Sequence, residues 1–138
     1  MNKVTTLAEA IDKKVALIKD YDQSEGVNSF TFNGQTTWLD KATRVGLVNS
    51  LTIERAAGRT ETQVWLNGMP YDIPINYALQ MMTVLELYAK DCYNTTERHL
   101  ATVKSLTDLN RVYNYDYTKG YPKRLHFEMN EQSLSVNG

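Results

Sequence analysis

The stretch from Asn76 to about Leu106 constrains the fold of this chain most, because its pattern predicts one long amphipathic helix. It contains neither proline nor glycine, and apolar side chains recur at helical spacing along one face. This apolar stripe comprises Ala78, Met81, Met82, Leu85, Tyr88, Cys92, Leu100, Val103 and Leu106. Such a helix is about 45 Å long, whereas a domain of this size has a radius of gyration of about 14 Å. We therefore predict that part of the apolar stripe packs on another chain.

Composition bounds the class of protein. The chain has 138 residues, 42% hydrophobic and 22% charged, which predicts one globular domain with a true core. The net charge of −1 provides no basic surface for nucleic acid or an anionic membrane. The N-terminal segment MNKVTTLAEAIDKKVALIKD has no apolar run long enough for a signal peptide or a membrane span. We therefore expect a soluble protein without a visible export signal. The single cysteine, Cys92, excludes an intrachain disulfide, and its place on the apolar stripe favours a buried thiol.

Two Asn-Gly pairs predict two β-hairpins. Asn33-Gly34 and Asn67-Gly68 suit a two-residue type I′ turn, in which both central residues need positive φ. The expected facing pairs are Phe32 with Gln35 and Phe30 with Thr37 in the first hairpin, then Leu66 with Met69, Val64 with Tyr71 and Trp65 with Pro70 in the second. Pro70 lacks an amide hydrogen, which predicts that its strand is an edge strand or is bulged.

Two further helices and a strand complete the expected elements. A Thr-x-x-Glu capping box predicts a first helix from Thr6 to about Tyr21. Asp40 is a natural N-cap for a second, from Lys41 to about Ala57, with one apolar face. That face is expected to contain Ala42, Val45, Val48, Leu51 and Ala56. Leu125, Phe127 and Met129 alternate with polar residues, the period of a half-buried strand.

Together these elements predict an α+β fold. The two Asn-Gly hairpins form an antiparallel sheet packed on helices, among them the long amphipathic helix of the C-terminal half. Residues 1–25 are expected to be an N-terminal helix and hinge, and 26–129 the hairpin, helix, hairpin, long helix and strand domain. Residues 130–138 have little to bury and are predicted to be a flexible tail.

The sequence contains no spacing typical of catalysis or metal binding. Cys92 and His99 fall two helical turns apart, too far to share one ion unless a third element intervenes. The glycines are scattered rather than gathered in a phosphate-binding loop. We therefore predict no catalytic residue, no metal and no cofactor. Glu86 and Asp91 are interpreted as solvated helix charges, with Lys90 spaced to pair with Glu86.

A protein interface is the best-supported kind of site. Tyr113, Tyr115, Tyr117 and Tyr121 are suited to contact a partner protein or a glycan, although a loop folded over the base of the long helix explains them equally well. Trp38 and Trp65 either pack under the flanking helices or lie at an interface. The candidate interface residues are Met82, Leu85, Tyr88, His99, Val103, Tyr113, Tyr115 and Tyr117.

A family resemblance rests on five segments: SFTFNG, WLDKATRVGLVNSL, VWLNG, ALQMMTVLELYAKDCYNTT and YDYTKGYP. In them the chain resembles a phage-associated family of unknown function, found in phage and prophage genomes beside or within tail-fibre and tail-fibre-assembly proteins. It is most similar to the variety from Bacteroides-type phages. The shared features, which include a basic residue where Arg44 stands, cover about Ser29 to Pro122. The family has no established catalytic residues, and the absence of an attached fibre or assembly domain implies a stand-alone small protein.

The resemblance implies a non-enzymatic structural protein of the virion, in the tail, baseplate or fibre region. It would be made in the bacterial host cytoplasm and would assemble with copies of itself or with other tail proteins. No nucleic acid, membrane or small-molecule partner is expected. One alternative is a small tail-fibre assembly chaperone that is not retained in the virion. A remote alternative is a glycan-active enzyme, which would require a concave site gathering carboxylates such as Glu86, Asp91 or Glu128.

Overall fold

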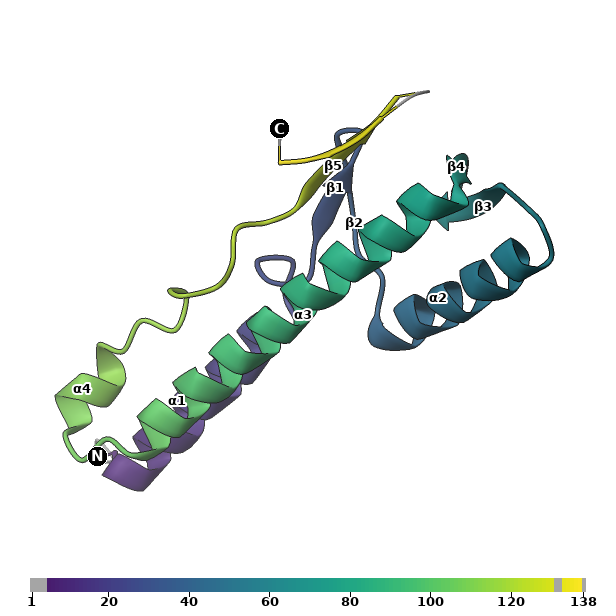
Figure 1. Ribbon diagram of the computed structural model, residues 1–138. Coiled ribbons are helices and arrows are strands. Elements are labelled where there is room, and N and C mark those ends of the chain that lie inside the picture. Colours follow the sequence, from purple (N-terminus) through teal and green to yellow (C-terminus); the bar gives the residue numbers. More distant parts are fainter. Residues whose placement is uncertain (1–4, 131–132, 138) are drawn as a thin grey trace. The chain divides into compact units, whose positions relative to one another are not determined.

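The computed structural model describes residues 5–130 and 133–137 and has an α+β architecture (Figure 1). In chain order the elements are α1 (Leu7–Asp22), β1 (Phe30–Phe32), β2 (Gln35–Thr37), α2 (Lys41–Ala56), β3 (Glu61–Leu66), β4 (Met69–Pro74), α3 (Ile75–Lys104), α4 (Leu109–Tyr113), β5 (His126–Met129) and β6 (Leu134–Val136). The long amphipathic helix is confirmed as α3. The short helix α4 was not expected from the sequence.

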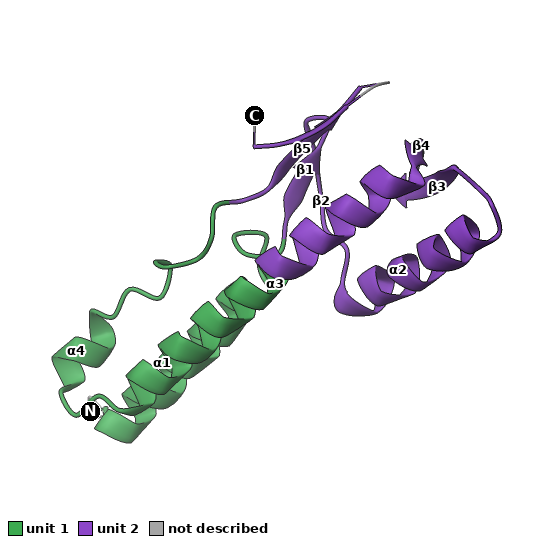
Figure 2. Cartoon of the chain, viewed as in Figure 1, with its two compact units in different colours: residues 1–28, 89–123 green, residues 29–88, 124–138 purple. Residues whose placement is uncertain are grey.

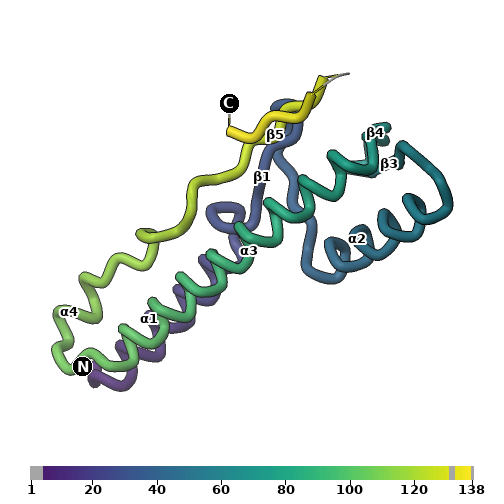
Figure 3. The backbone as a smooth tube through the Cα atoms, in the orientation of Figure 1, coloured from purple at the N-terminus to yellow at the C-terminus, as the bar shows by residue number. Residues whose placement is uncertain are grey.

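The chain divides into two compact units, coloured separately in Figure 2. Unit 1 comprises Met1–Asn28 and Ala89–Lys123, and unit 2 comprises Ser29–Tyr88 and Arg124–Gly138. The backbone trace in Figure 3 follows α3 as one continuous helix, so its first half belongs to unit 2 and its second half to unit 1. The expected boundaries at residues 25 and 129 treat the chain as consecutive segments, whereas each unit combines two separate stretches.

The two hairpins lie in different sheets within unit 2. β1 and β2 pair antiparallel, and β3 and β4 do the same, both in the register expected from the sequence. However, β3 and β4 form a sheet of their own, whereas β1 and β2 belong to a four-stranded sheet of order β2-β1-β5-β6. In that sheet β1 and β5 run parallel. The prediction that both hairpins form one antiparallel sheet is therefore wrong.

Strands distant in sequence explain this difference. β5 pairs with the edge of β1 that β2 does not use. The amide of Thr31 donates to Leu125 O at 3.0 Å, and that of Asn33 donates to Phe127 O at 2.9 Å. β6 then pairs antiparallel with β5. The predicted flexible tail, 130–138, thus contains a paired strand at Leu134–Val136, while residues 131, 132 and 138 lie outside the described part.

The core of unit 2 lies where α2 and α3 meet the inner face of the β3-β4 hairpin. The side chains there enclose a void of only about 10 Å³, too small for a ligand. They are Phe30, Leu39, Leu47, Leu51, Val64, Leu66, Ile73, Ala78, Met81 and Met82.

The buried face of α2 differs from the one expected. Arg44 and Leu51 are buried, and Leu47 and Glu54 are half-buried. Val45, by contrast, is 58% exposed, although it was assigned to the apolar face. The reason is that the charged side chains of Arg44 and Glu54 have polar partners within unit 2. The face of α2 that is buried is therefore not the face on which the apolar residues lie.

Unit 1 is built around the packing of α1 on the second half of α3. Ile18, Leu100 and Val103 form its core cluster, and Tyr115 and Tyr117 pack against it. The hydroxyl of Thr6 accepts from the amide of Glu9 at 3.1 Å, as the expected N-terminal cap requires.

Candidate functional site

The predicted interface residues on α3 are covered by other parts of the chain. Met82, Leu85 and Tyr88 are buried in unit 2, and Val103 is buried in the core cluster of unit 1. A second molecule would first meet other faces of the protein, because these four side chains have almost no accessible surface. Their contact with a partner stays a prediction.

His99 and Tyr115 lie in direct contact within unit 1. The Nδ1 atom of His99 is 2.5 Å from the Tyr115 hydroxyl, and its Nε2 atom is 2.7 Å from Lys119 O. A carbonyl oxygen only accepts, so Nε2 donates and, in the neutral ring, Nδ1 accepts from the tyrosine. Both ring nitrogens therefore hold the segment after α4 against α3.

A second set of polar contacts fastens the same segment. The Thr96 hydroxyl donates to Asp22 Oδ1 at 2.7 Å and lies 2.7 Å from the Tyr121 hydroxyl. The pKa of Tyr121 is raised above its usual value, mainly by burial and also by the nearby Asp22 carboxylate. The hydrogen bond with Thr96 acts in the opposite direction. The ring of Tyr21 meets that of Tyr121 edge to face, with centroids 5.5 Å apart. This network orders the tyrosine-rich segment.

The remaining predicted tyrosines differ in exposure. Tyr117 packs edge to face on Tyr21 with centroids 5.7 Å apart, and the ammonium of Lys14 lies over its ring. Tyr113 is 50% exposed, although its carbonyl accepts from Lys14 Nζ at 3.2 Å. The structure therefore brings Tyr115, Tyr117 and His99 together in unit 1. Tyr113 is more exposed than any of these three residues.

Glu86 forms an ion pair with Arg44, whereas the sequence predicted a pair with Lys90 on the same helix. Its carboxylate accepts from Arg44 Nε at 2.7 Å, and Arg44 Nη1 donates to Leu39 O at 2.7 Å. The guanidinium of Arg44 also lies 5.3 Å from the ring centroid of Trp38. Trp38 therefore packs inside unit 2, which is one of the two readings that the sequence leaves open.

Several large apolar side chains of unit 2 are exposed. On α2, Val45 and Ile53 are 58% and 60% exposed, and Val48 lies one turn from Val45. On the second hairpin, Trp65 is 60% exposed and Met69 is also exposed. We call these five residues the exposed apolar surface of unit 2. The sequence pattern missed the exposure of Val45 and Val48 because it assigned both to the apolar face of α2, whereas for Trp65 it left an interface position open.

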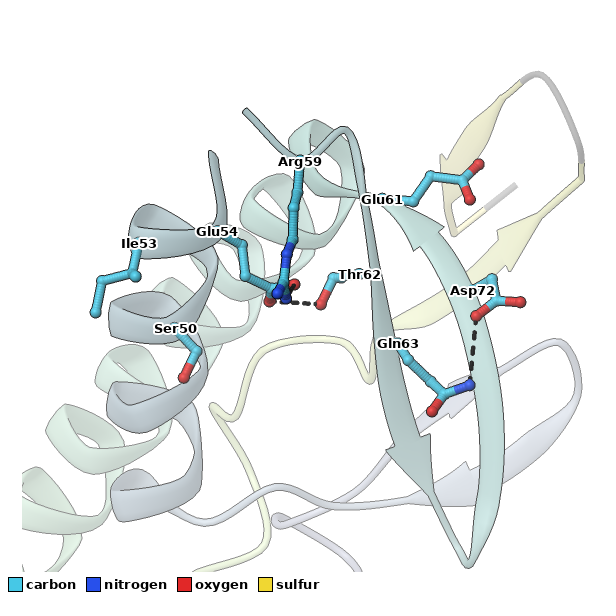
Figure 4. A pocket seen from close by; sticks show the side chains of 8 residues that line it. All are labelled: Ser50, Ile53, Glu54, Arg59, Glu61, Thr62, Gln63 and Asp72. Carbon is cyan, nitrogen blue, oxygen red and sulfur yellow. Dashed lines mark hydrogen bonds and ion pairs between the residues drawn. The ribbon is translucent and has the colours of Figure 1, made fainter. Parts of the chain in front are cut away.

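An open groove of about 590 Å³ lies between α2 and the β3-β4 hairpin, as Figure 4 shows. Its lining residues are Ser50, Ile53, Glu54, Arg59, Glu61, Thr62, Gln63 and Asp72. The side chains of Ser50, Ile53 and Glu54 come from α2, and those of Glu61, Thr62, Gln63 and Asp72 come from the two strands. The groove is thus bounded by α2 on one side and by the two-stranded β3-β4 sheet on the other.

Most of the polar side chains that line this groove are paired with one another. Glu54 accepts from Thr62 Oγ1 at 2.8 Å and pairs with Arg59 Nη1 at 3.3 Å. Across the hairpin, Gln63 Nε2 donates to Asp72 Oδ1 at 3.5 Å. The register of the second hairpin, which the sequence predicted, places Gln63 opposite Asp72. The carboxylates named for a glycan-active site, Glu86, Asp91 and Glu128, do not line the groove.

Within residues 5–130 and 133–137, no three or more His, Cys, Asp or Glu side chains lie close enough together to bind a metal ion. Over the same ranges, no helix has both the length and the apolar character needed to cross a bilayer. Comparisons of the chain with protein-family models, with curated proteins and with solved structures find no match.

Proposed function

We propose that this protein is a non-enzymatic assembly component that acts through protein-protein contacts. The observation that carries this proposal is the exposed apolar surface of unit 2, where large side chains from α2 and the second hairpin face solvent. Burying such side chains against a partner is favourable in water, so they supply apolar area for a protein-protein contact.

The place of assembly follows from the family resemblance. A phage-associated family found with tail-fibre proteins supports a position in the virion, in the tail, baseplate or fibre region, with synthesis in the bacterial host cytoplasm. The partners are copies of the chain itself or other tail proteins. This part of the proposal rests on the sequence segments from Ser29 to Pro122.

The test is incorporation into particles. In the phage that encodes the chain, the protein should co-purify with virions and be detected there by mass spectrometry. Val45→Asp places a charge on the exposed apolar surface of unit 2 and should reduce incorporation at least tenfold. It should leave the melting temperature nearly unchanged, because Val45 is 58% exposed.

Asn76→Asp is the matched control, because it adds the same charge at an exposed position of unit 2 where a helix begins. This variant should be incorporated normally. Intact virions that lack the protein, together with a soluble complex between the protein and a fibre protein, would favour the assembly chaperone. Virions and lysates without any complex of the protein would contradict an assembly role.

A further inference from the structure

We propose that a second copy of this chain pairs with the free edge of β3, so that the two β3 strands join antiparallel across a two-fold axis at Gln63. The result is a four-stranded sheet of order β4-β3-β3-β4, shared by two molecules. This inference deepens the proposed assembly role and rests on it, since it names one partner and the surface that it uses.

The hydrogen-bond pattern of the second hairpin identifies this edge. Leu66 and Met69 flank a two-residue connection, so they form a hydrogen-bonded pair, and such pairs alternate along an antiparallel ladder. The amide of Ile75 donates to Thr60 O at 2.9 Å, as this alternation requires. The backbone N–H and C=O groups of Glu61, Gln63 and Trp65 therefore point away from β4. Among the described residues, none of these groups takes part in a backbone hydrogen bond.

The opposite edge of the hairpin is closed to a further strand. By the same alternation, the outward positions of β4 are Pro70, Asp72 and Pro74. Proline has no amide hydrogen, so two of these three positions have no donor to offer. The outward positions of β3 carry neither proline nor lysine, two residues that commonly protect an edge strand, and Glu61 is the one charged residue among these positions. Of the two edges, only that of β3 is fit to accept a strand.

The edge of β3 is complementary to itself. Pairing centred on Gln63 sets Gln63 opposite Gln63 of the other copy and Glu61 opposite Trp65, so no like charges face each other. The three facing pairs exchange about six backbone hydrogen bonds. Because Gln63 already lies beside Asp72, a row of amides and carboxylates would cross the joined sheet.

The surroundings of the edge also favour a preformed partner strand. The open groove of about 590 Å³ borders β3, which gives an incoming strand access. Trp65 and Ile53, each 60% exposed, lie on the two elements that frame this approach. A second copy brings a strand that is already ordered, so pairing avoids the entropy cost of ordering a flexible peptide.

The test uses charge at the two-fold axis. The chain should dimerise reversibly in sedimentation velocity experiments run over a range of concentrations. Gln63→Lys and Gln63→Glu should each weaken the dimer about fivefold or more, because each variant sets two like charges directly opposite. An equimolar mixture of the two variants should restore association, since opposite charges then meet. Circular dichroism should show that both variants stay folded.

Gln35→Lys is the control, because Gln35 is an exposed strand residue of β2 and its change should leave the dimer intact. A wild-type chain that stays monomeric at every concentration, a dimer indifferent to the Gln63 variants, or a mixture that fails to restore association would overturn the inference. So would binding of an unrelated extended peptide by a strictly monomeric chain.

The two proposals fail in distinguishable ways. A dimer that depends on Gln63 in a protein absent from every phage complex would retain the β3 pairing and reject the function. Incorporation into virions by a chain that never pairs through β3 would retain the function and reject the pairing.

Discussion

At the scale of single residues, the most consequential contact is the ion pair between Arg44 and Glu86. The side chain of Arg44 is only 7% exposed, whereas that of Glu86 is 51% exposed. A guanidinium taken out of water is costly unless its charge and donors are satisfied, and here Glu86, Leu39 O and the Trp38 ring satisfy them. The pair therefore fixes how α2 begins against α3.

Removal of Glu86 should leave the Arg44 charge uncompensated. We expect Glu86→Ala to lower the free energy of unfolding by about 2 kcal/mol, less than for a fully buried pair because solvent screens the half-exposed carboxylate. In the background of Arg44→Met, the same change should cost close to nothing, since the partner is already gone. Urea denaturation of the four proteins measures this coupling.

Asp91→Ala, which removes an exposed acid of the same helix, is the control and should have little effect. An equal loss from Glu86→Ala in both backgrounds would show that the ion pair contributes nothing.

At the scale of elements, the helix ends follow from local side chains. Asp40 caps α2 by accepting from the amide of Thr43 at 2.8 Å. This backbone hydrogen bond lowers the pKa of the Asp40 carboxyl below its usual 3.8, and the neighbouring Arg44 charge acts in the same direction. The folded state thus favours the ionised carboxylate. Its contribution to stability is present above the unfolded pKa and is lost as the pH falls through the folded pKa.

Asp40→Ala should therefore lower the melting temperature near neutral pH, because an N-cap acceptor is lost. The difference from the wild type should shrink as the pH falls below about 4. Differential scanning calorimetry at several pH values checks both parts. A difference that grows on acidification would contradict the assigned role of the ionised carboxylate.

At the scale of the whole molecule, one helix belongs to two compact units. The first half of α3 contributes Met81, Met82 and Leu85 to the core of unit 2, and its second half contributes Leu100 and Val103 to that of unit 1. Each unit has its own buried cluster, so each has its own source of stability.

A cavity in one unit should therefore loosen that unit first. Ile18 is completely buried in unit 1, and Ile18→Ala should cost about 3 kcal/mol. We expect amide hydrogen exchange to accelerate in Leu7–Asp22 more than in Glu61–Pro74, a segment of unit 2. Exchange measured by mass spectrometry on peptides from both segments tests this. Equal acceleration in both would show that the two units unfold as one.

The local elements of this protein were largely determined by the sequence. Thr6 and Asp40 marked where two helices begin, and both cap them through a side-chain oxygen. The residues that connect the hairpin strands, Asn33-Gly34 and Asn67-Gly68, all have positive φ, and the facing pairs are those expected. These features depend on residues within a few positions of one another, so a sequence pattern contains the information they need.

The tertiary structure alone decided which elements meet. The parallel pairing of β1 with β5 joins segments about a hundred residues apart, and no local pattern specifies it. The side chain of Arg44 is buried because Glu86 and Leu39 O accept its hydrogen bonds. Val45, the next residue of the helix, is therefore exposed. The free edge of β3 is likewise a property of the sheet. A backbone group is free only when no other segment reaches it, which a sequence read in order does not reveal.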